Sequence, residues 1–459
     1  MAKNVSFSSS SAVQFAEPCE VYASQTRPAI SDHMRDLWFE RSACVLIMAF
    51  YGVSGFIPLV GSNQAVDPAI ATNPGGVAAA VGIGSQLAIA LLVLLLLLRR
   101  FHHVMKSMPM LHWGGIFAVL AVVSAIWSQD PMITMRRAIP FLLSTLFALY
   151  FASRFDLDEQ LSILWITMIA LSVATVLISV LVPSYGLDVS PGHTHDWRGV
   201  FTQKNACGRA MAFAIAITLA KGRINLPRAF SLLLFLFVLA MSGSRSFWLV
   251  GLSVFVLAAL LAFLKRYDLV SRAVIISIAV LLGVVTLALG VIFASDILAL
   301  LGRDATLTGR SDIWREVWRA ILKRPLLGYG FSAFWIGLKG EAFNVITMLG
   351  FVVLHAHNGF LEIMLELGGT GLAIFVLSYL RACYLALRLI RSKYIEQAVW
   401  PIFVLFLIVL SNMDENSLLI YNGIFWVLYV IALVDLELLQ QLSSGSVEAR
   451  TPTGPLAHI

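Results

Sequence analysis

Long apolar runs, separated by short polar stretches, recur along most of the chain. A helix needs about 20 apolar residues to cross roughly 30 Å of hydrocarbon. This pattern predicts an all-α integral membrane protein with about twelve transmembrane helices. The predicted spans are 42–60, 76–98, 109–127, 137–153, 161–182, 206–220, 228–242, 246–264, 272–293, 358–380, 398–411 and 419–437.

Two polar ends and one long loop interrupt the spans. Residues 1–41 are Ser-rich and lack the apolar core of a signal peptide, so we expect an uncleaved, disordered tail. The spans then divide into nine over 42–293 and three over 358–437. Between them we expect a loop over 294–357 with an amphipathic helix, and after them a second tail over 438–459.

Composition and charge agree with a membrane location. Of the 459 residues, 59% are hydrophobic and 13% charged, and the mean hydropathy is +0.86, whereas soluble domains carry about 25% charged residues. The pI near 9.2 reflects basic residues that punctuate the spans, so membrane topology explains it better than nucleic acid does. The four cysteines have no paired spacing, which indicates neither disulfides nor a zinc site.

Lysines and arginines also predict the orientation. Cytoplasmic loops are enriched in them, and this rule puts both termini inside and the loop 294–357 outside. The remaining basic residues fall on the outer side, gathered at span ends where they would hold a phosphate. They are Arg136, Arg137, Arg198, Lys204, Arg209, Arg245 and a cluster from Arg303 to Lys339.

A histidine segment precedes the tenth span. His355, His357 and Asn358 are polar groups at a membrane boundary, where such groups are costly and usually functional. A helix starting there would aim its backbone N–H groups at an anion, and a neutral histidine would accept a proton from an attacking hydroxyl. Glu362 and Glu366, four residues apart inside the span, would orient polar groups or seal a cavity. The alternative is a polar helix cap without a catalytic role.

The loop contains the predicted amphipathic helix, Ser311–Lys323. Its apolar face carries Trp314 and Trp318, and its basic face carries Arg315. Such helices lie in the membrane interface. This one either rests there without further role or covers a lipid head group, with Arg310 reaching inward from just ahead of it.

Two further segments carry candidate ligands. The stretch 183–205 contains His193 and His195, but no third ligand is spaced to complete a metal set. The acidic residues assigned to the outer side, Asp130, Asp188, Asp196 and Asp304, form no close pair, which argues against a Mg²⁺- or Mn²⁺-dependent enzyme. We therefore expect no metal and no cofactor. Arginine binds phosphate oxygens in a bidentate manner. The candidate diphosphate ligands are Arg198, Lys204, Arg209, Arg245 and Arg310.

Several motifs together resemble the O-antigen ligase and polysaccharide polymerase superfamily of bacteria. The main one is His357-Asn358 followed by Gly368 and Gly371. The others are RGVFTQKN from Arg198, Ser244-Arg245, Gly309-Arg310-x3-Trp314, Arg324-Pro325-x2-Gly328-x-Gly330, and Trp127-Ser128-x2-Pro131 followed by Arg136-Arg137. Through the FTQKN segment, the chain resembles in particular the exopolysaccharide polymerases of the ExoQ type.

The resemblance implies a glycosyltransferase of the GT-C architecture in the bacterial inner membrane, with its site facing the periplasm. The substrate would be an oligosaccharide on undecaprenyl diphosphate, and the surrounding partners would be membrane lipid, a chain-length regulator and the export machinery. The implied catalytic residues are His357 with Asn358, and secondary candidates are Arg136, Arg137, His355, Arg315 and Glu362. The alternatives are a ligase that transfers finished polymer to a lipid A core or other acceptor, and a flippase or transporter of the same lipid.

Overall fold

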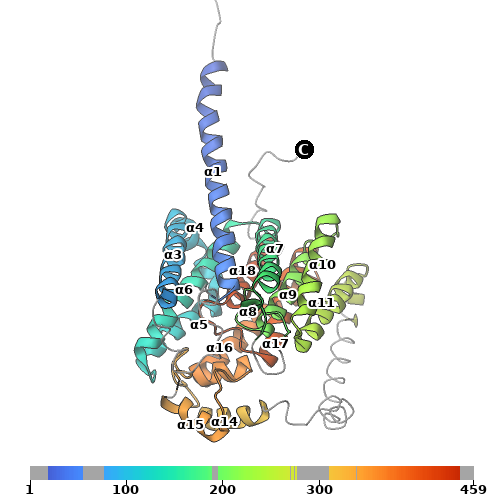
Figure 1. Cartoon of the computed structure of the whole chain (residues 1–459). Coiled ribbons are helices and arrows are strands. Elements are labelled where there is room, and N and C mark those ends of the chain that lie inside the picture. The colour runs from blue at the N-terminus through green and yellow to red at the C-terminus, as the bar shows by residue number, and fades with distance from the viewer. Residues whose placement is uncertain are drawn as a thin grey trace, which may run out of the picture. The chain divides into compact units, whose positions relative to one another are not determined.

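The computed structural model describes residues 19–54, 77–188, 195–268, 270–272, 274–275, 310–337 and 339–444, and within them it is helical with no extended strand (Figure 1). Eight of its helical segments are long and apolar enough to span a membrane. The prediction of a helical membrane protein is thus confirmed. The predicted span 272–293 and the loop segment 294–309 lie almost wholly outside the described residues.

The first half of the chain forms the helices α1 to α11. α1 begins at Cys19, inside the segment expected to be a disordered tail. The third predicted span is built from four short pieces, α4, η2, α5 and η3, which together cover Phe101–Ile126. The bounds are α1 Cys19–Gly52, α3 Val77–Arg99, α4 Phe101–Ser107, η2 Met108–Leu111, α5 His112–Val123, η3 Ser124–Ile126, α6 Pro131–Arg154, α7 Leu157–Leu181, α8 Pro183–Gly186, α9 Lys204–Ala220, α10 Leu226–Met241 and α11 Arg245–Leu264.

The second half supplies the centre of the bundle. α17 and α18 form its core. In their most apolar stretches 67% and 72% of the residues are buried, against 22% in α3. α14 and α15 lie at one end of the bundle, next to α16 (Figure 1). The bounds are α14 Arg310–Lys323, α15 Gly340–Leu349, α16 Gly359–Ile390, α17 Ile395–Asp414 and α18 Ile424–Ser443.

α14 starts one residue earlier than predicted, at Arg310. Its apolar face packs through Ile313, Val317 and Ile321 into a small core shared with α15 and the following loop, which includes Tyr329 and Phe334. The helix therefore belongs to a packed lobe and does not float alone. Its basic face remains exposed, and Arg315 pairs there with Asp312 at 2.9 Å.

A kink divides α16 at Gly368, whose φ of 65° and ψ of −166° only glycine adopts readily. The kink leaves backbone groups without helical partners, and the loop 325–330 satisfies them through four hydrogen bonds. Tyr329 N and Gly330 N donate to the carbonyls of residues 365 and 366, at 2.9 Å each. The amides of residues 369 and 370 donate to the carbonyls of 325 and 326, at 2.7 and 3.1 Å. Irregular backbone at membrane depth persists only when protein groups satisfy it in this way.

Candidate functional site

The histidine segment is a turn held from two sides. Trp314 of α14 donates its ring N–H to the carbonyl of Ala356 at 2.9 Å, and the Glu362 carboxylate accepts the amide N–H of Ala356. The Glu362 carboxylate also accepts the ring N–H of Trp335, at 3.0 and 3.1 Å. His357 itself has a φ of 50°, in the left-handed region that few non-glycine residues occupy. Glu362 thus holds the turn that contains His357 in place, and its role in a reaction stays a prediction.

Asn358 caps α16. Its Oδ1 accepts the amide N–H groups of Phe360 at 3.0 Å and Leu361 at 3.1 Å. These two donors are therefore occupied, and the helix start offers fewer free N–H groups to an anion than we expected. Asn358 fixes the direction in which the preceding histidine leaves the helix.

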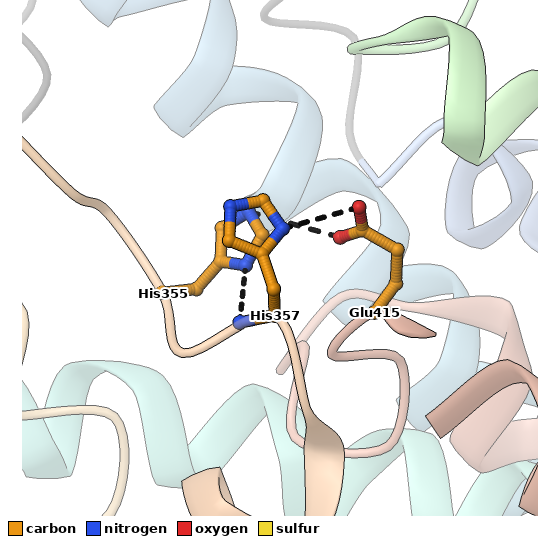
Figure 2. A group of neighbouring side chains, drawn as sticks. All are labelled: His355, His357 and Glu415. Carbon is orange, nitrogen blue, oxygen red and sulfur yellow. Dashed lines mark hydrogen bonds and ion pairs between the residues drawn. The ribbon is translucent and has the colours of Figure 1, made fainter. Parts of the chain in front are cut away.

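The central contact of the site joins His357 to Glu415, the residue that follows α17. Nδ1 of His357 lies 3.2 Å from Oε1 of Glu415, and Nε2 of His355 lies 3.8 Å from Oε2 (Figure 2). Asn205, at the start of α9, donates to the same carboxylate at 2.8 Å. The side chain of Glu415 is only 2% exposed. A buried carboxylate with three such neighbours is strongly oriented.

This contact decides the tautomer of His357. An ionised carboxylate only accepts hydrogen bonds, so the proton of the neutral ring belongs on Nδ1. Nε2 then carries a lone pair, and none of the described residues bonds to it. The His357 side chain is 29% exposed to solvent. A carboxylate that orients a histidine whose other nitrogen is free is the arrangement of a general base.

Glu415 and His355 lie beside His357, and each keeps a single protonation state across neutral pH. Burial alone would raise the pKa of Glu415, but the hydrogen bond from His357 and the nearby His355 and Arg209 side chains lower it to about 2. Burial lowers the pKa of His355 to about 4, against the attraction of Glu415. Glu415 is therefore ionised and His355 neutral over the range in which a histidine base operates.

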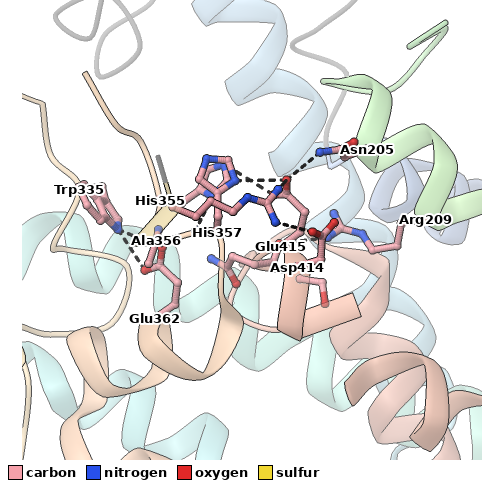
Figure 3. A network of polar contacts seen from close by, with 12 residues as sticks. Asn205, Arg209, Trp335, His355, Ala356, His357, Glu362, Asp414 and Glu415 are labelled. Carbon is pink, nitrogen blue, oxygen red and sulfur yellow. Dashed lines mark hydrogen bonds and ion pairs between the residues drawn. The ribbon is translucent and has the colours of Figure 1, made fainter. Parts of the chain in front are cut away.

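Arginines surround the carboxylate end of the site (Figure 3). Arg310 pairs with Asp414 and lies 3.8 Å from Oε1 of Glu415. Arg209 is 3% exposed, donates to the Asn416 carbonyl at 3.2 Å and stacks on Phe425. Its Nε has no hydrogen-bond partner in the described part of the chain. Of the predicted diphosphate ligands, these two therefore lie at the site itself.

The other predicted cations are more dispersed. Lys204 pairs with Asp196 at 2.7 Å, and Arg198 donates to the Tyr185 carbonyl at 2.8 Å. Arg245 begins α11, and the adjoining Ser244 donates to Asn205 at 2.7 Å. The Arg245 side chain is exposed, and no described group forms a hydrogen bond or ion pair with it. It is therefore the cation best able to take up a phosphate.

Three remaining predicted residues lie away from Glu415. Arg137 of α6 donates to the carbonyl of Ser332, whereas Arg136 is exposed. Arg315 belongs to the exposed face of α14. Of the two histidines in the stretch 183–205, His195 is exposed and His193 lies outside the described residues.

His355, His357 and Glu415 also offer three ligand atoms within 4.8 Å of one another, as a metal site would. Two observations disfavour a cation there. The His357 amide donates to Nδ1 of His355 at 3.3 Å, which assigns the ring proton to Nε2, the atom that a metal would need. The guanidinium of Arg310 also lies beside the same carboxylate. The donor set thus suits a hydrogen-bonded base better than a metal.

Sequence reasoning missed Glu415 and its neighbour Asp414. They end an apolar span in the run Asp-Glu-Asn, and topology does not require acidic residues there. The acidic residues considered from the sequence did not include these two, which both contact Arg310. Their partnership with the histidines was hidden because 58 positions separate His357 from Glu415.

Comparison with known proteins agrees with the resemblance seen in the motifs. Residues 230–376 match the family model described as O-Antigen ligase, and this stretch includes His357, Asn358 and the kink at Gly368. Over these residues the chain is similar to the O-antigen ligase family, as its motifs predicted.

Two relatives refine this placement. The chain is 27% identical over 350 residues to the exopolysaccharide production protein ExoQ of Rhizobium meliloti (strain 1021), an alignment that covers 73% of this chain and 74% of that protein. It is also 38% identical over 76 residues to the Rickettsia prowazekii (strain Madrid E) protein named "Putative polysaccharide ligase RP358", which covers 15% of this chain and 17% of that one.

Proposed function

We propose that this protein is an inverting, metal-independent glycosyltransferase that polymerises oligosaccharide repeat units carried on undecaprenyl diphosphate. The observation that carries the proposal is the oriented His357, whose Nδ1 faces Glu415 and whose Nε2 has no partner among the described residues. The similarity to ExoQ over most of both chains favours exopolysaccharide as the product.

In the proposed reaction, an acceptor hydroxyl oxygen attacks the anomeric carbon of the donor sugar. The bond from that carbon to the diphosphate breaks, and the hydroxyl proton passes to Nε2 of His357. Base catalysis of this kind contributes roughly 10²–10⁴-fold. Glu415 stabilises the imidazolium that forms, as an oriented carboxylate does beside a histidine base.

The leaving diphosphate gains negative charge as the bond breaks, and preorganised cations stabilise such charge strongly. Arg245 is the first candidate ligand because it is exposed and unpaired among the described groups. Arg310 is the second, since it keeps 23% of its side-chain exposure beside Glu415. Arg198, Lys204 and Arg209 complete the proposed set.

The proposed setting is the bacterial inner membrane, with both termini cytoplasmic and His357 facing the periplasm. In this arrangement the chain has about twelve spans in a GT-C architecture, and the lobe containing α14 and α15 belongs to the periplasmic loop 294–357. Two of the loops assigned to the outer side, 61–75 and 412–418, contain no Lys or Arg, which supports this orientation.

The proposal is tested with purified protein and undecaprenyl-diphosphate-linked repeat units in the presence and absence of EDTA. We expect longer glycans and free undecaprenyl diphosphate in both cases. Loss of conversion with EDTA would overturn the metal-independent mechanism. A flippase would move the lipid across vesicle membranes without breaking the sugar–phosphate bond.

The second candidate is a ligase, favoured by the match to the O-antigen ligase model and by the name of the second relative. Lipid analysis of a deletion strain separates the two. A strain without the polymerase accumulates single lipid-linked repeat units, whereas a strain without the ligase accumulates lipid-linked polymer.

A further inference from the structure

A cavity of about 260 Å³ opens beside His355, and the mechanism above does not use it. It is bordered by two aromatic rings and four polar side chains. These residues are Trp335 and Tyr421, with Arg137, Ser332, Glu366 and Asn416. Ligand sites have this composition, with aromatic walls and a few placed polar groups, and their usual volumes start near 300 Å³. The space suits a group about the size of a single sugar.

The polar groups of this cavity are held in place by Ser332. Arg137 donates to the carbonyl of Ser332 from one side, and the Glu366 carboxylate accepts its amide N–H at 2.8 Å from the other. The guanidinium of Arg137 also lies 5.8 Å from the centre of the Tyr421 ring. The Arg137 guanidinium and the Ser332 hydroxyl border the cavity and present directional donors and acceptors. Such a surface suits the hydroxyl groups of an uncharged sugar.

The cavity and the diphosphate ligands lie on different sides of the histidines. In Figure 3, Trp335 lies to one side of His355 and His357, and Asn205 and Arg209 lie to the other. The side with Asn205 also adjoins Ser244 and the unpaired Arg245. The two sides therefore differ in chemistry, since one offers aromatic rings beside a few hydrogen-bonding groups and the other offers several basic side chains.

We propose that the cavity is the acceptor subsite, which holds the sugar whose hydroxyl is deprotonated by His357. This inference rests on the proposed function and deepens it by assigning a place to each substrate. The donor binds through its diphosphate on the arginine side, and the acceptor sugar stacks against Tyr421 and Trp335. Its hydroxyl oxygen forms the new bond to the donor carbon, its proton moves to Nε2, and the diphosphate leaves.

Tyr421 is the best residue for a test, because its ring borders the cavity and its hydroxyl forms no hydrogen bond with any described residue. Trp335 is less suitable because its ring N–H also supports Glu362. Loss of an aromatic contact of this kind weakens binding by roughly 2- to 10-fold. Tyr421→Phe keeps the ring, and Tyr384→Ala removes an exposed ring that does not border the cavity.

The assay uses repeat-unit lipid extracted from a strain without this protein as donor, and the water-soluble oligosaccharide released from it by mild acid as acceptor. Initial rates are measured while each substrate is varied in turn. For Tyr421→Ala we expect the KM for the soluble acceptor to rise roughly 2- to 10-fold and the KM for the donor lipid to stay unchanged. Tyr384→Ala should behave as wild type, and Tyr421→Phe, which keeps the ring, should raise the acceptor KM less than Tyr421→Ala does.

An unchanged acceptor KM in Tyr421→Ala, or a rise in the donor KM instead, would overturn the assignment of the cavity. If the wild-type protein transferred no sugar from the lipid at all, the proposed function would fail first. The two failures are thus distinguishable in the same experiment.

Discussion

In the described part of the chain, histidine, glutamate and arginine meet in one cluster before α18 and in another near its end. Before the helix, His357, Glu415 and Arg310 meet, and near its end Glu437 contacts His112 and Arg381. In the second cluster, Arg381 binds both oxygens of Glu437, at 2.6 and 3.0 Å. His112 lies 3.7 Å from that carboxylate, and its side chain is 46% exposed.

The difference between the clusters lies in what surrounds them. The space bordered by His112, Arg381 and Glu437 is about 10 Å³, roughly one water molecule, against about 260 Å³ beside His355. Both histidines have a positive φ, at 36° for His112 and 50° for His357, so backbone strain does not separate them. Residue types alone therefore do not mark a site. The first cluster differs because its carboxylate orients a histidine beside a cavity that has room for a substrate.

The largest expected effect separates the two histidines. His357→Ala should lower the rate of polymer formation by about 10²–10⁴-fold, because it removes the proposed base. His112→Ala, the matched change in the second cluster, should leave the rate within about twofold. The measurement is initial rate with equal amounts of folded protein in membranes, and polymer of wild-type length and yield from His357→Ala would refute the assignment.

The next comparison concerns the two glutamates. Glu415→Gln should lower kcat by on the order of 10²–10⁴-fold, since an amide can donate to Nδ1 and so favour the wrong tautomer of His357. Glu437→Gln should keep kcat and lower the free energy of unfolding by about 0.2–1 kcal/mol, because it weakens a partly exposed ion pair. Equal kcat values in the two variants would contradict the distinction between the clusters.

The third comparison is made within α16, in the part of the helix that leads into the site. Gly368→Ala should destabilise the protein by about 1–3 kcal/mol through backbone strain alone. The new Cβ would also lie 2.2 Å from the Leu326 carbonyl oxygen. Gly369→Ala is the matched control, since its nearest neighbour would be the Pro325 carbonyl at 3.3 Å. Thermal unfolding in detergent measures both, and similar Tm values would show that the kink tolerates a side chain.

The last comparison is a pH dependence that belongs to the site cluster. The unfolded chain protonates His355 near pH 6.5 and the folded protein only near pH 4, so the unfolded state binds more protons between these values. Stability should therefore fall as the pH drops from about 6.5 to 4. Glu415, lowered from 4.5 to about 2, adds a further loss between those two values. His355→Asn should flatten the upper part of a Tm-against-pH curve, and an unchanged slope would contradict this.

Much of the architecture follows from local patterns. Apolar length places most spans within a few residues, and the amphipathic period over 311–323 predicts α14. Asn358 reads as a helix cap because the capping interaction spans only three residues. The kink at Gly368 was not predicted, since it depends on hydrogen bonds with the loop 325–330, about forty positions earlier.

The site was predictable to the same degree. His357 and Glu362 stand close together in the sequence, so both were candidates from local spacing alone. Glu415, Asn205 and Arg310 are separated from them by whole spans or loops, and only packing brings them together. Where a side chain acts through a distant partner, sequence indicates the residue type and leaves the partner unknown.

The hydrogen bonds between the loop 325–330 and α16 have a consequence for engineering the protein. The four hydrogen bonds satisfy backbone groups that the kinked helix cannot satisfy itself. A variant with this loop deleted or exchanged would leave up to four backbone groups of α16 without partners, at several kcal/mol each in an apolar setting. Loss of activity in such a chimera would therefore report a misfolded α16 before it reported anything about sugar specificity.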